Sequence, residues 1–356
     1  MKANKNHLVL FRRLLALNFL LAIIFSSCQK ESLNTDSAGP SKIPTNTLSL
    51  SLVSKFAPAS FPTTFTWHAP ISLTGASYQT IRGLNITGGS SPCIFLNNCH
   101  DIHITKSLLQ GSTNINAAVY LLNCYNIYID TCYIKNSVRG VLGKSCTNNI
   151  RVVYNKIYNT TDPNLMSNGG GNAVQFNMCN GTGMRIDSNF IYDPTPSTSI
   201  GDKISLYQSS GTWNSYIRIY YNQIRGGSIN PAGFTGIALG DGVNSNYQDA
   251  EYNIACSTGN VGMVIGGGQH MIMSNNLVYG AHAVPSSAGI MFFNNSTTPT
   301  LDININNNKI NWTNSAWKID NYWFNPNAGK VNSTGNTTPG TGDPTITNAI
   351  LQDPLF

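Results

Sequence analysis

Short stretches of alternating apolar and polar residues recur along most of the chain. The full pattern is apolar-x-apolar, then Asn, one residue and another apolar residue, as in IRVVYNKI; the two earliest copies, 102–109 and 127–134, have Ser and Cys in place of Asn, and the copy at 248–255 is degenerate. Alternation with a period of two indicates a β-strand whose apolar side chains face one core. The copies lie at 102–109, 127–134, 150–157, 184–191, 217–224, 248–255, 271–278 and 303–310.

A second kind of apolar strand precedes most copies, at 118–122, 172–176, 203–207, 236–240, 262–266 and 289–293. Each repeat therefore contains these two strands and a third short strand, which is marked by the apolar residue after Asn. Successive copies start 23 to 34 residues apart. Three strands in that length predict one coil of a parallel β-helix, stacked about 4.8 Å from the next. We expect an all-β solenoid of about nine to ten coils.

The Asn residues of the repeats form the clearest column. A tight turn in a stacked coil leaves backbone groups unpaired, and a buried Asn amide can satisfy them and bond to its neighbours above and below. We expect Asn336, in the tail, to lie outside this column. Its predicted members are Asn155, Asn189, Asn222, Asn253, Asn276 and Asn308.

This column resembles the asparagine ladder of pectate-lyase-like, right-handed parallel β-helices, over roughly residues 75–312. The resemblance is specific for fold and weak for activity, because that fold hosts lyases, hydrolases, epimerases and passive adhesins. It implies that the strands preceding the Asn copies form the first sheet. It also implies that a glycan would lie on that sheet.

Cysteines follow the same repeat. Cys99, Cys124, Cys146 and Cys179 each precede a repeat by a few residues and are expected to form a buried column. We interpret them as packed free thiols, with one or two disulfides as the alternative. No Cys/His spacing favours a metal site.

The N-terminus has the pattern of an exported lipoprotein. A basic region (2–13) and an apolar run of about 12 residues, too short to span a bilayer, end at Ser26-Ser27-Cys28. This ending resembles a bacterial lipobox, which implies lipidation of Cys28, and the following charged residues resemble the export signal of Bacteroidetes-type surface lipoproteins. The expected location is the outer membrane, exposed at the cell surface and attached through the lipid alone.

The repeats and the N-terminal pattern together divide the chain into five segments. The predicted segments are a signal peptide (1–27), a tether (28–48), an N-terminal cap (49–75), the β-helix (76–312) and a C-terminal cap and tail (313–356).

Composition adds little to this picture. Only 10% of the residues are charged. Without the four basic residues of the expected signal peptide, 17 basic residues face 15 acidic ones, which gives nucleic-acid binding no support. We expect a monomer whose partner is a polysaccharide, and an acidic one by the chemistry considered next.

The first sheet supplies the predicted substrate-binding residues. Long loops rich in turn residues enter it, and such loops often build sites. Its outward positions suggest a floor of small residues beside a polar wall, which lets a ligand approach the backbone. The wall is Gln175, Ser205 and Tyr207, and the floor is Gly236, Ala238, Gly262 and Gly266.

Lys203 is the first candidate for a catalytic base. A lyase acting on a uronic acid needs a base, together with positive charge to stabilise the enolate-like intermediate. Arg225 and His270 are further catalytic candidates. Asp202 and Asp241 could hold Ca²⁺, act in catalysis, or form the carboxylate pair of a glycoside hydrolase. The two open hypotheses are a surface enzyme acting on an acidic polysaccharide, with lyase chemistry preferred, and a non-catalytic glycan-binding or adhesive lipoprotein.

The second sheet carries a row of charges. Position two of the repeat is Arg151, Arg185 and Arg218 in successive coils and then Asp249, and position four includes Asp187 and other acids. The favoured interpretation is a solvated, partly salt-bridged face of little energetic value. The alternative is a groove for an anionic glycan.

Overall fold

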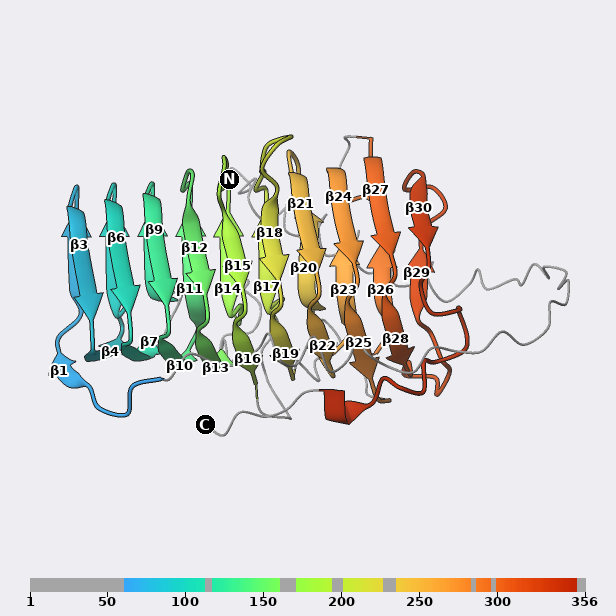
Figure 1. The fold of residues 1–356 in the computed structure, drawn as a ribbon, viewed down its shortest axis with the longest axis horizontal. Coiled ribbons are helices and arrows are strands. Elements are labelled where there is room, and N and C mark those ends of the chain that lie inside the picture. Colours follow the sequence, from blue (N-terminus) through green and yellow to red (C-terminus); the bar gives the residue numbers. More distant parts are fainter. Residues whose placement is uncertain are drawn as a thin grey trace, which may run out of the picture. The chain divides into compact units, whose positions relative to one another are not determined.

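The computed structural model describes residues 61–112, 117–160, 171–193, 201–226, 235–282, 286–295 and 299–350. These residues form three sheets of ten parallel strands each, and every strand pairs with the equivalent strand of the coil before and after it. The strands stack side by side along one axis (Figure 1). The protein is therefore a right-handed parallel β-helix of ten coils, as the sequence predicted.

Sheet A contains the strands that follow the asparagine turn. They are β1 (Thr66–His68), β4 (Leu84–Gly89), β7 (Leu108–Ser112), β10 (Tyr133–Ser137), β13 (Lys156–Thr160), β16 (Phe190–Tyr192), β19 (Gln223–Arg225), β22 (Ile254–Cys256), β25 (Leu277–Gly280) and β28 (Lys309–Trp312).

Sheet B is the predicted first sheet. Its strands are β2 (Ile71–Thr74), β5 (Ile94–Asn97), β8 (Ala117–Leu122), β11 (Arg139–Lys144), β14 (Val174–Asn177), β17 (Ile204–Tyr207), β20 (Thr235–Asp241), β23 (Val261–Ile265), β26 (Ala288–Phe292) and β29 (Tyr322–Phe324).

Sheet C is the predicted second sheet and precedes the asparagine turn. Its strands are β3 (Ser77–Arg82), β6 (His100–Thr105), β9 (Tyr125–Asp130), β12 (Ile150–Val153), β15 (Arg185–Asp187), β18 (Ile217–Tyr220), β21 (Asn246–Glu251), β24 (Gln269–Ser274), β27 (Leu301–Asn306) and β30 (Val331–Thr334). Beyond it the described residues hold one short 3-10 helix, η1 (Asn348–Ile350).

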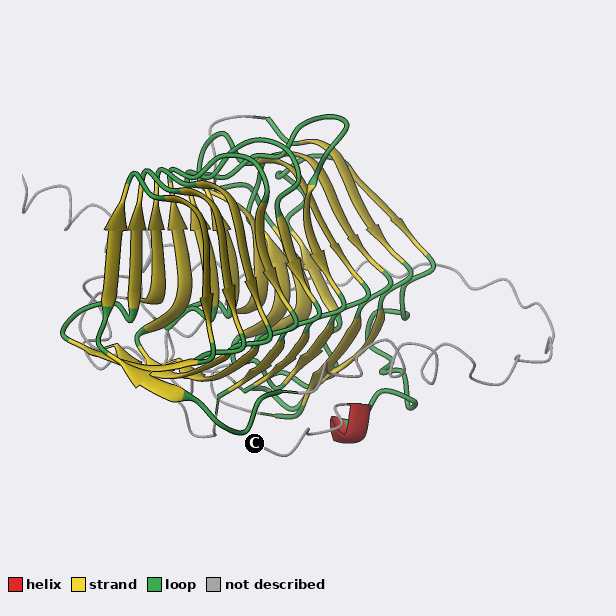
Figure 2. Ribbon diagram, turned by 60° about the vertical axis from the view of Figure 1, so that its left-hand side comes forward, coloured by secondary structure: helices red, strands yellow, loops and turns green. Residues whose placement is uncertain are grey.

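The core lies between the three sheets, which Figure 2 shows enclosing a common interior. The inward positions of each sheet are aliphatic and almost all fully buried, for example Ile129, Ile186 and Ile219 in sheet C. Because the period-two pattern sets which residues face inward, it also fixes the register between coils.

The solenoid is longer at both ends than the predicted span of 76–312. At the N-terminal end, β1 and β2 pair with β4 and β5, so part of the expected cap belongs to the first coil. At the C-terminal end, β29 and β30 continue sheets B and C.

The asparagine ladder is present and is one rung longer than predicted. At each rung the side-chain Oδ1 accepts from the backbone N and from Nδ2 of the asparagine in the preceding coil, at 2.8–3.1 Å from Asn155 through Asn336. Asn336 accepts both bonds from Asn308, so its expected position outside the column was wrong.

The residue before each rung adopts the left-handed conformation, which turns the chain from sheet C into sheet A. Tyr154, Tyr221 and Tyr252 have φ values of 56° to 57° there. This conformation is costly for a non-glycine residue, and the buried amide bonds of the ladder hold it in place. Two of these tyrosines, Tyr154 and Tyr221, consequently project at the edge of sheet C.

The cysteine prediction is confirmed for the described residues, where all seven cysteines are free and buried. The Cys124 and Cys146 thiols interact across adjacent coils. The pKa of Cys146 rises to about 12: the hydrogen bond with Cys124 lowers it, but the bond with Cys179 and burial outweigh this. These thiols are therefore packed, unreactive core groups.

The predicted signal peptide, Cys28 and the tether lie outside the described residues. Among the helices of the described part of the chain, none is long and apolar enough to cross a membrane.

Candidate functional site: an arginine groove on sheet C

One outward row of sheet C carries three arginines in adjacent strands. Arg151 of β12 is in register with Arg185 of β15, which is in register with Arg218 of β18. Stacked strands place successive side chains of such a row about 4.8 Å apart. The row continues with Tyr128 of β9 on one side and Asp249 of β21 on the other.

A groove of about 340 Å³ follows this row. We call it the arginine groove. Its lining side chains combine the three guanidinium groups with tyrosine rings from β9 and from the turns after sheet C. The lining residues are Tyr128, Arg151, Val153, Tyr154, Arg185, Asp187, Ser188, Arg218 and Tyr221.

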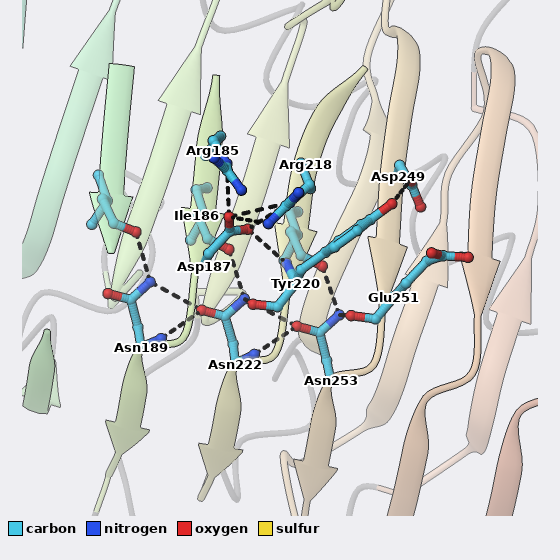
Figure 3. Close-up of polar contacts among 12 residues, drawn as sticks. Arg185, Ile186, Asp187, Asn189, Arg218, Tyr220, Asn222, Asp249, Glu251 and Asn253 are labelled. Atoms are coloured by element: carbon cyan, nitrogen blue, oxygen red, sulfur yellow. Dashed lines mark hydrogen bonds and ion pairs between the residues drawn. The ribbon is translucent and has the colours of Figure 1, made fainter. Parts of the chain in front are cut away.

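Asp187 neutralises only part of the positive charge. Its Oδ2 accepts from Arg185 Nε and pairs with Arg218 Nη2, both at 2.9 Å, and its Oδ1 accepts from the backbone N of Tyr220 at 3.1 Å. Figure 3 shows Arg185 and Arg218 reaching Asp187 from adjacent strands. Arg151 lies beyond this cluster and is exposed.

The groove therefore holds three guanidinium groups against one carboxylate. Like charges opposite one another on adjacent strands repel and destabilise the sheet. A bound anion would relieve this repulsion, and a planar guanidinium can bind a carboxylate or sulfate with two parallel hydrogen bonds. The geometry thus favours an anionic ligand.

A cluster of acids with a tyrosine closes the far end of the row. Tyr220 Oη donates to Asp249 Oδ2, and the Arg218 guanidinium lies 4.3 Å from the Tyr220 ring centre. Burial raises the pKa of Asp249 to about 7. The hydrogen bond from Tyr220 lowers this pKa, and the charge of Glu251 raises it further. Because these acids hold protons more readily than usual, this end repels an anion less than its composition suggests.

Lys203 does not occupy the predicted cleft. It is 1% exposed, and its Nζ pairs with Asp193 Oδ2 and donates to Gly171 O at 3.3 Å. The expectation that it points outward was wrong, because it precedes β17 at the corner between sheets A and B and its side chain turns into that corner. A buried ammonium held by a carboxylate cannot act on a substrate at the surface.

The small-residue floor on sheet B is not open either. Ala238 is 3% exposed and packs in an apolar cluster with Val264, Met291 and Phe293. A Cβ on Gly262 would lie 2.3 Å from Val278 of sheet A, so close packing between sheets explains this glycine.

The same is true of Gly236 and of part of the polar wall. A Cβ on Gly236 would meet Gly262 O at 2.7 Å and Thr258 at 3.0 Å, whereas Gly266 has room near Phe293. Ser205 is 1% exposed, and only Gln175 and Tyr207 remain half-buried. The predicted substrate floor is therefore wrong for these buried members.

Arg225 and His270 belong to other faces. Arg225 ends β19 of sheet A, and its Nη2 donates to Asn348 O at 2.9 Å, which anchors the C-terminal segment. His270 lies on β24 of sheet C, stacks on Tyr247 with ring centres 4.6 Å apart, and has Nδ1 3.2 Å from Asp302 Oδ2. Neither joins Lys203 in one site.

Asp202 and Asp241 do interact. Burial and then the charge of Asp241 raise the pKa of Asp202 to about 7, although Thr235 N donates to its Oδ1 at 3.0 Å. Burial also raises the pKa of Asp241. A proton donor beside a second carboxyl group fits the paired-carboxylate hypothesis, but Asp202 precedes β17, Asp241 ends β20, and neither lines the arginine groove.

Calcium binding by this pair stays a prediction. Ca²⁺ takes six to eight oxygen ligands, of which two carboxylates supply a part. No group of three or more His, Cys, Asp or Glu side chains suited to a metal occurs among the residues that the structure describes.

The raised pKa of Asp202 gives a pH-dependent stability. An unfolded Asp has a pKa near 3.9, so between about pH 4 and pH 7 the folded chain holds a proton that the unfolded chain has lost. Stability from this group is complete below pH 4 and falls as the pH rises through about 7. Asp202→Asn should flatten the fall in melting temperature between pH 5 and pH 8. An unchanged pH profile in the variant would refute this assignment.

Comparisons with known proteins assign no family to the chain. No protein-family model matches the chain, and the search of curated proteins also finds no match. The chain is similar to the solved structure of a Family 28 exopolygalacturonase from Yersinia enterocolitica, with 12% identity, a TM-score of 0.46 and coverage of 78% of this chain and 70% of that one.

A second similar structure is that of a mutant tailspike protein of E. coli bacteriophage HK620, in complex with a pentasaccharide. It is 10% identical, with a TM-score of 0.33, and the match covers 76% of this chain and 60% of that one. The assignment of the fold rests on the three parallel sheets themselves.

The sequence also indicated two aromatic residues of this row that the predicted site did not include. His103 and Tyr128 occupy position two of their repeats, the same position as the three arginines. Their register confirms that all five side chains form one row, from β6 to β18.

Proposed function

We propose that the protein is a cell-surface lipoprotein that binds an acidic polysaccharide in the arginine groove. The observation that carries this proposal is the row of Arg151, Arg185 and Arg218 along one groove, with a single carboxylate inside it. Three regularly spaced cations suit a polymer that presents an anionic group at repeated intervals.

The tyrosines of the groove support a sugar rather than a small anion. Tyr128, Tyr154 and Tyr221 line it together with the arginines. Aromatic rings present a flat apolar surface with a polar hydroxyl at the edge, which can stack on the C–H face of a sugar ring and bond to its hydroxyl groups. Guanidinium groups then select the acidic sugars.

The proposed location follows from the N-terminal sequence alone. A lipid on Cys28 would hold the β-helix at the outer membrane, where it meets extracellular glycans. Membrane fractionation of a Cys28→Ser variant tests this anchor: release of a folded protein supports it, and unchanged membrane association contradicts it.

Binding is tested with the full-length protein and soluble uronic-acid polymers, using isothermal titration calorimetry. Arg151→Ala should weaken binding by roughly 10-fold or more, because a charge-assisted hydrogen bond contributes about 1.5–3 kcal/mol. The affinity of the parent protein for these polymers should fall with added salt, because the arginines of the groove are at least partly exposed.

Lys135→Ala is the matched control, because Lys135 is a partly buried cation on the outer face of sheet A. It should bind like the parent, and a neutral glucan should bind neither protein. Equal losses of affinity in the Arg151 and Lys135 variants would show only a nonspecific charge effect and would contradict the groove.

A polysaccharide bound in the groove could be cleaved by a lyase reaction or held without chemistry, as an adhesin would hold it. A lyase must neutralise the carboxylate of a uronic acid so that the neighbouring proton can leave. The arginine groove offers that charge. An adhesive protein would use the same groove and release no products.

A further inference from the structure

His103 and Tyr128 extend the row that contains the arginines toward the N-terminus. His103 of β6 is in register with Tyr128 of β9, which is in register with Arg151. The His103 and Tyr128 rings stack, with centres 4.8 Å apart and planes 23° from parallel. Tyr128 therefore adjoins Arg151, the first cation of the groove, and His103 lies one strand further along the same row.

Asp130 orients the His103 ring and determines which ring nitrogen carries the hydrogen. His103 Nε2 lies 2.7 Å from Asp130 Oδ2, while Thr105 Oγ1 donates to the other oxygen of the carboxylate. When Nε2 donates its hydrogen to this carboxylate, the lone pair of the imidazole ring lies on Nδ1. The His103 side chain is 39% exposed and stacks on Tyr128, which lines the groove.

Tyr128 is suited to donate a proton. Burial raises the pKa of Tyr128, as do the charges of Asp130 and Tyr154, and these effects outweigh Arg151 and Arg185, which lower it. The hydroxyl is consequently protonated at neutral pH. Tyr128 lines the same groove as Arg151 and Arg185, so it lies near a carboxylate bound there.

We propose that His103 and Tyr128 catalyse β-elimination in a uronic-acid polysaccharide whose carboxylate is bound by Arg151. This inference rests on the proposed binding function and assigns the reaction to the same groove. Neither residue lies on sheet B, where the resemblance to pectate-lyase-like proteins placed the site.

The reaction balances without water or a further reactant. His103 Nδ1 removes the proton from the ring carbon next to the carboxylate, and Arg151 stabilises the charge that develops there. The electron pair forms a C=C bond to the neighbouring ring carbon, whose bond to the glycosidic oxygen breaks. That oxygen takes the hydroxyl proton of Tyr128, and the protonated His103 then returns a proton to the tyrosinate. Two shorter chains result, one with an unsaturated terminal sugar.

The test incubates the full-length protein with a panel of uronic-acid polymers and follows the ultraviolet absorbance of the unsaturated product, with binding measured in parallel. Parent protein should release product from at least one polymer. His103→Gln and Tyr128→Phe should each reduce turnover by roughly 100-fold or more, the usual contribution of a proton-transfer group. Both should still bind, because the arginines remain and Tyr128→Phe keeps the ring.

His100→Ala is the matched control. His100 also stacks on a tyrosine, with its ring centre 4.7 Å from that of Tyr125, and its Nδ1 lies 2.7 Å from Asp101 Oδ2. Its row contains Ser77 and Tyr125 and leads to no arginine groove among the described residues, so turnover should be unchanged.

The outcomes separate this inference from the proposed function. Parent protein that binds a uronic-acid polymer but forms no unsaturated product on the whole panel would overturn the elimination reaction and leave binding intact. Product formation that survives both His103→Gln and Tyr128→Phe would overturn the assignment of these residues. Failure to bind any acidic polymer would overturn the proposed function itself.

Discussion

Lys203→Met is expected to destabilise the folded protein by about 3–5 kcal/mol, the usual cost of breaking a buried ion pair by removing one partner. Asp193 is fully buried, and without Lys203 its carboxylate would keep the hydrogen bonds from Thr160 but lose its cation. Urea denaturation followed by circular dichroism measures this loss. Lys144→Met, on sheet B where the lysine is half-buried, is the control and should change stability by about 0.5 kcal/mol or less.

The double variant Lys203→Met/Asp193→Ser should be more stable than the Lys203→Met single variant. It leaves no unpaired charge, and a serine can still accept from the neighbouring coil, as Ser137 Oγ does from Ser112 N at 3.3 Å. Stability losses that simply add in the double variant would show that the two charges do not stabilise each other.

Asn222→Ala should cost about 1–3 kcal/mol or more, because several buried groups lose a partner at once. Asn222 Oδ1 accepts from Asn189 N and Nδ2 at 3.0 Å, and its Nδ2 donates to Ile186 O at 2.7 Å and to Asn253 Oδ1 at 3.0 Å. Figure 3 shows this part of the ladder. The midpoint of urea denaturation reports the effect.

Asn327→Ala is the control for the ladder, because Asn327 is exposed. It should leave the midpoint nearly unchanged. A similar midpoint for Asn222→Ala and Asn327→Ala would contradict the view that the buried amides stabilise the stacked turns.

The sequence predicted the fold well because each coil repeats the same physical solution. A buried Asn after two inward apolar residues marks the same turn in coil after coil, and this sets the register of all three sheets. Prediction failed at Asn336, whose repeat (331–338) has Ser333 and Thr338 where earlier copies have apolar residues. The last coil of the described residues can carry polar residues at these positions, since it packs against a neighbouring coil on one side only.

The site was harder to predict because alternation within a strand does not hold at the corners. Lys203 was assigned outward from Ile204 and Leu206, which do face the core. Lys203 itself precedes the strand, where the chain turns between sheets, and its side chain is free to turn toward Asp193. Corner packing likewise explains Gly236 and Gly262, which sequence alone cannot distinguish from a ligand floor.

The arginine row was visible in the sequence, but its meaning was not. Position two of the repeat correctly placed Arg151, Arg185 and Arg218 in one row, and Asp187 does pair with two of them. The sequence did not establish the groove, nor did it indicate the tyrosines that reach it from left-handed turn positions. The resemblance to a known fold directed attention to sheet B instead.

The most direct test of the arginine groove is a crystal structure of the full-length protein with an acidic oligosaccharide that calorimetry shows to bind. The proposed function predicts the sugar on sheet C, with its carboxylates against Arg151, Arg185 and Arg218 and a ring stacked on Tyr128 or Tyr154. An oligosaccharide bound instead on sheet B, beside Gln175 and Tyr207, would contradict it.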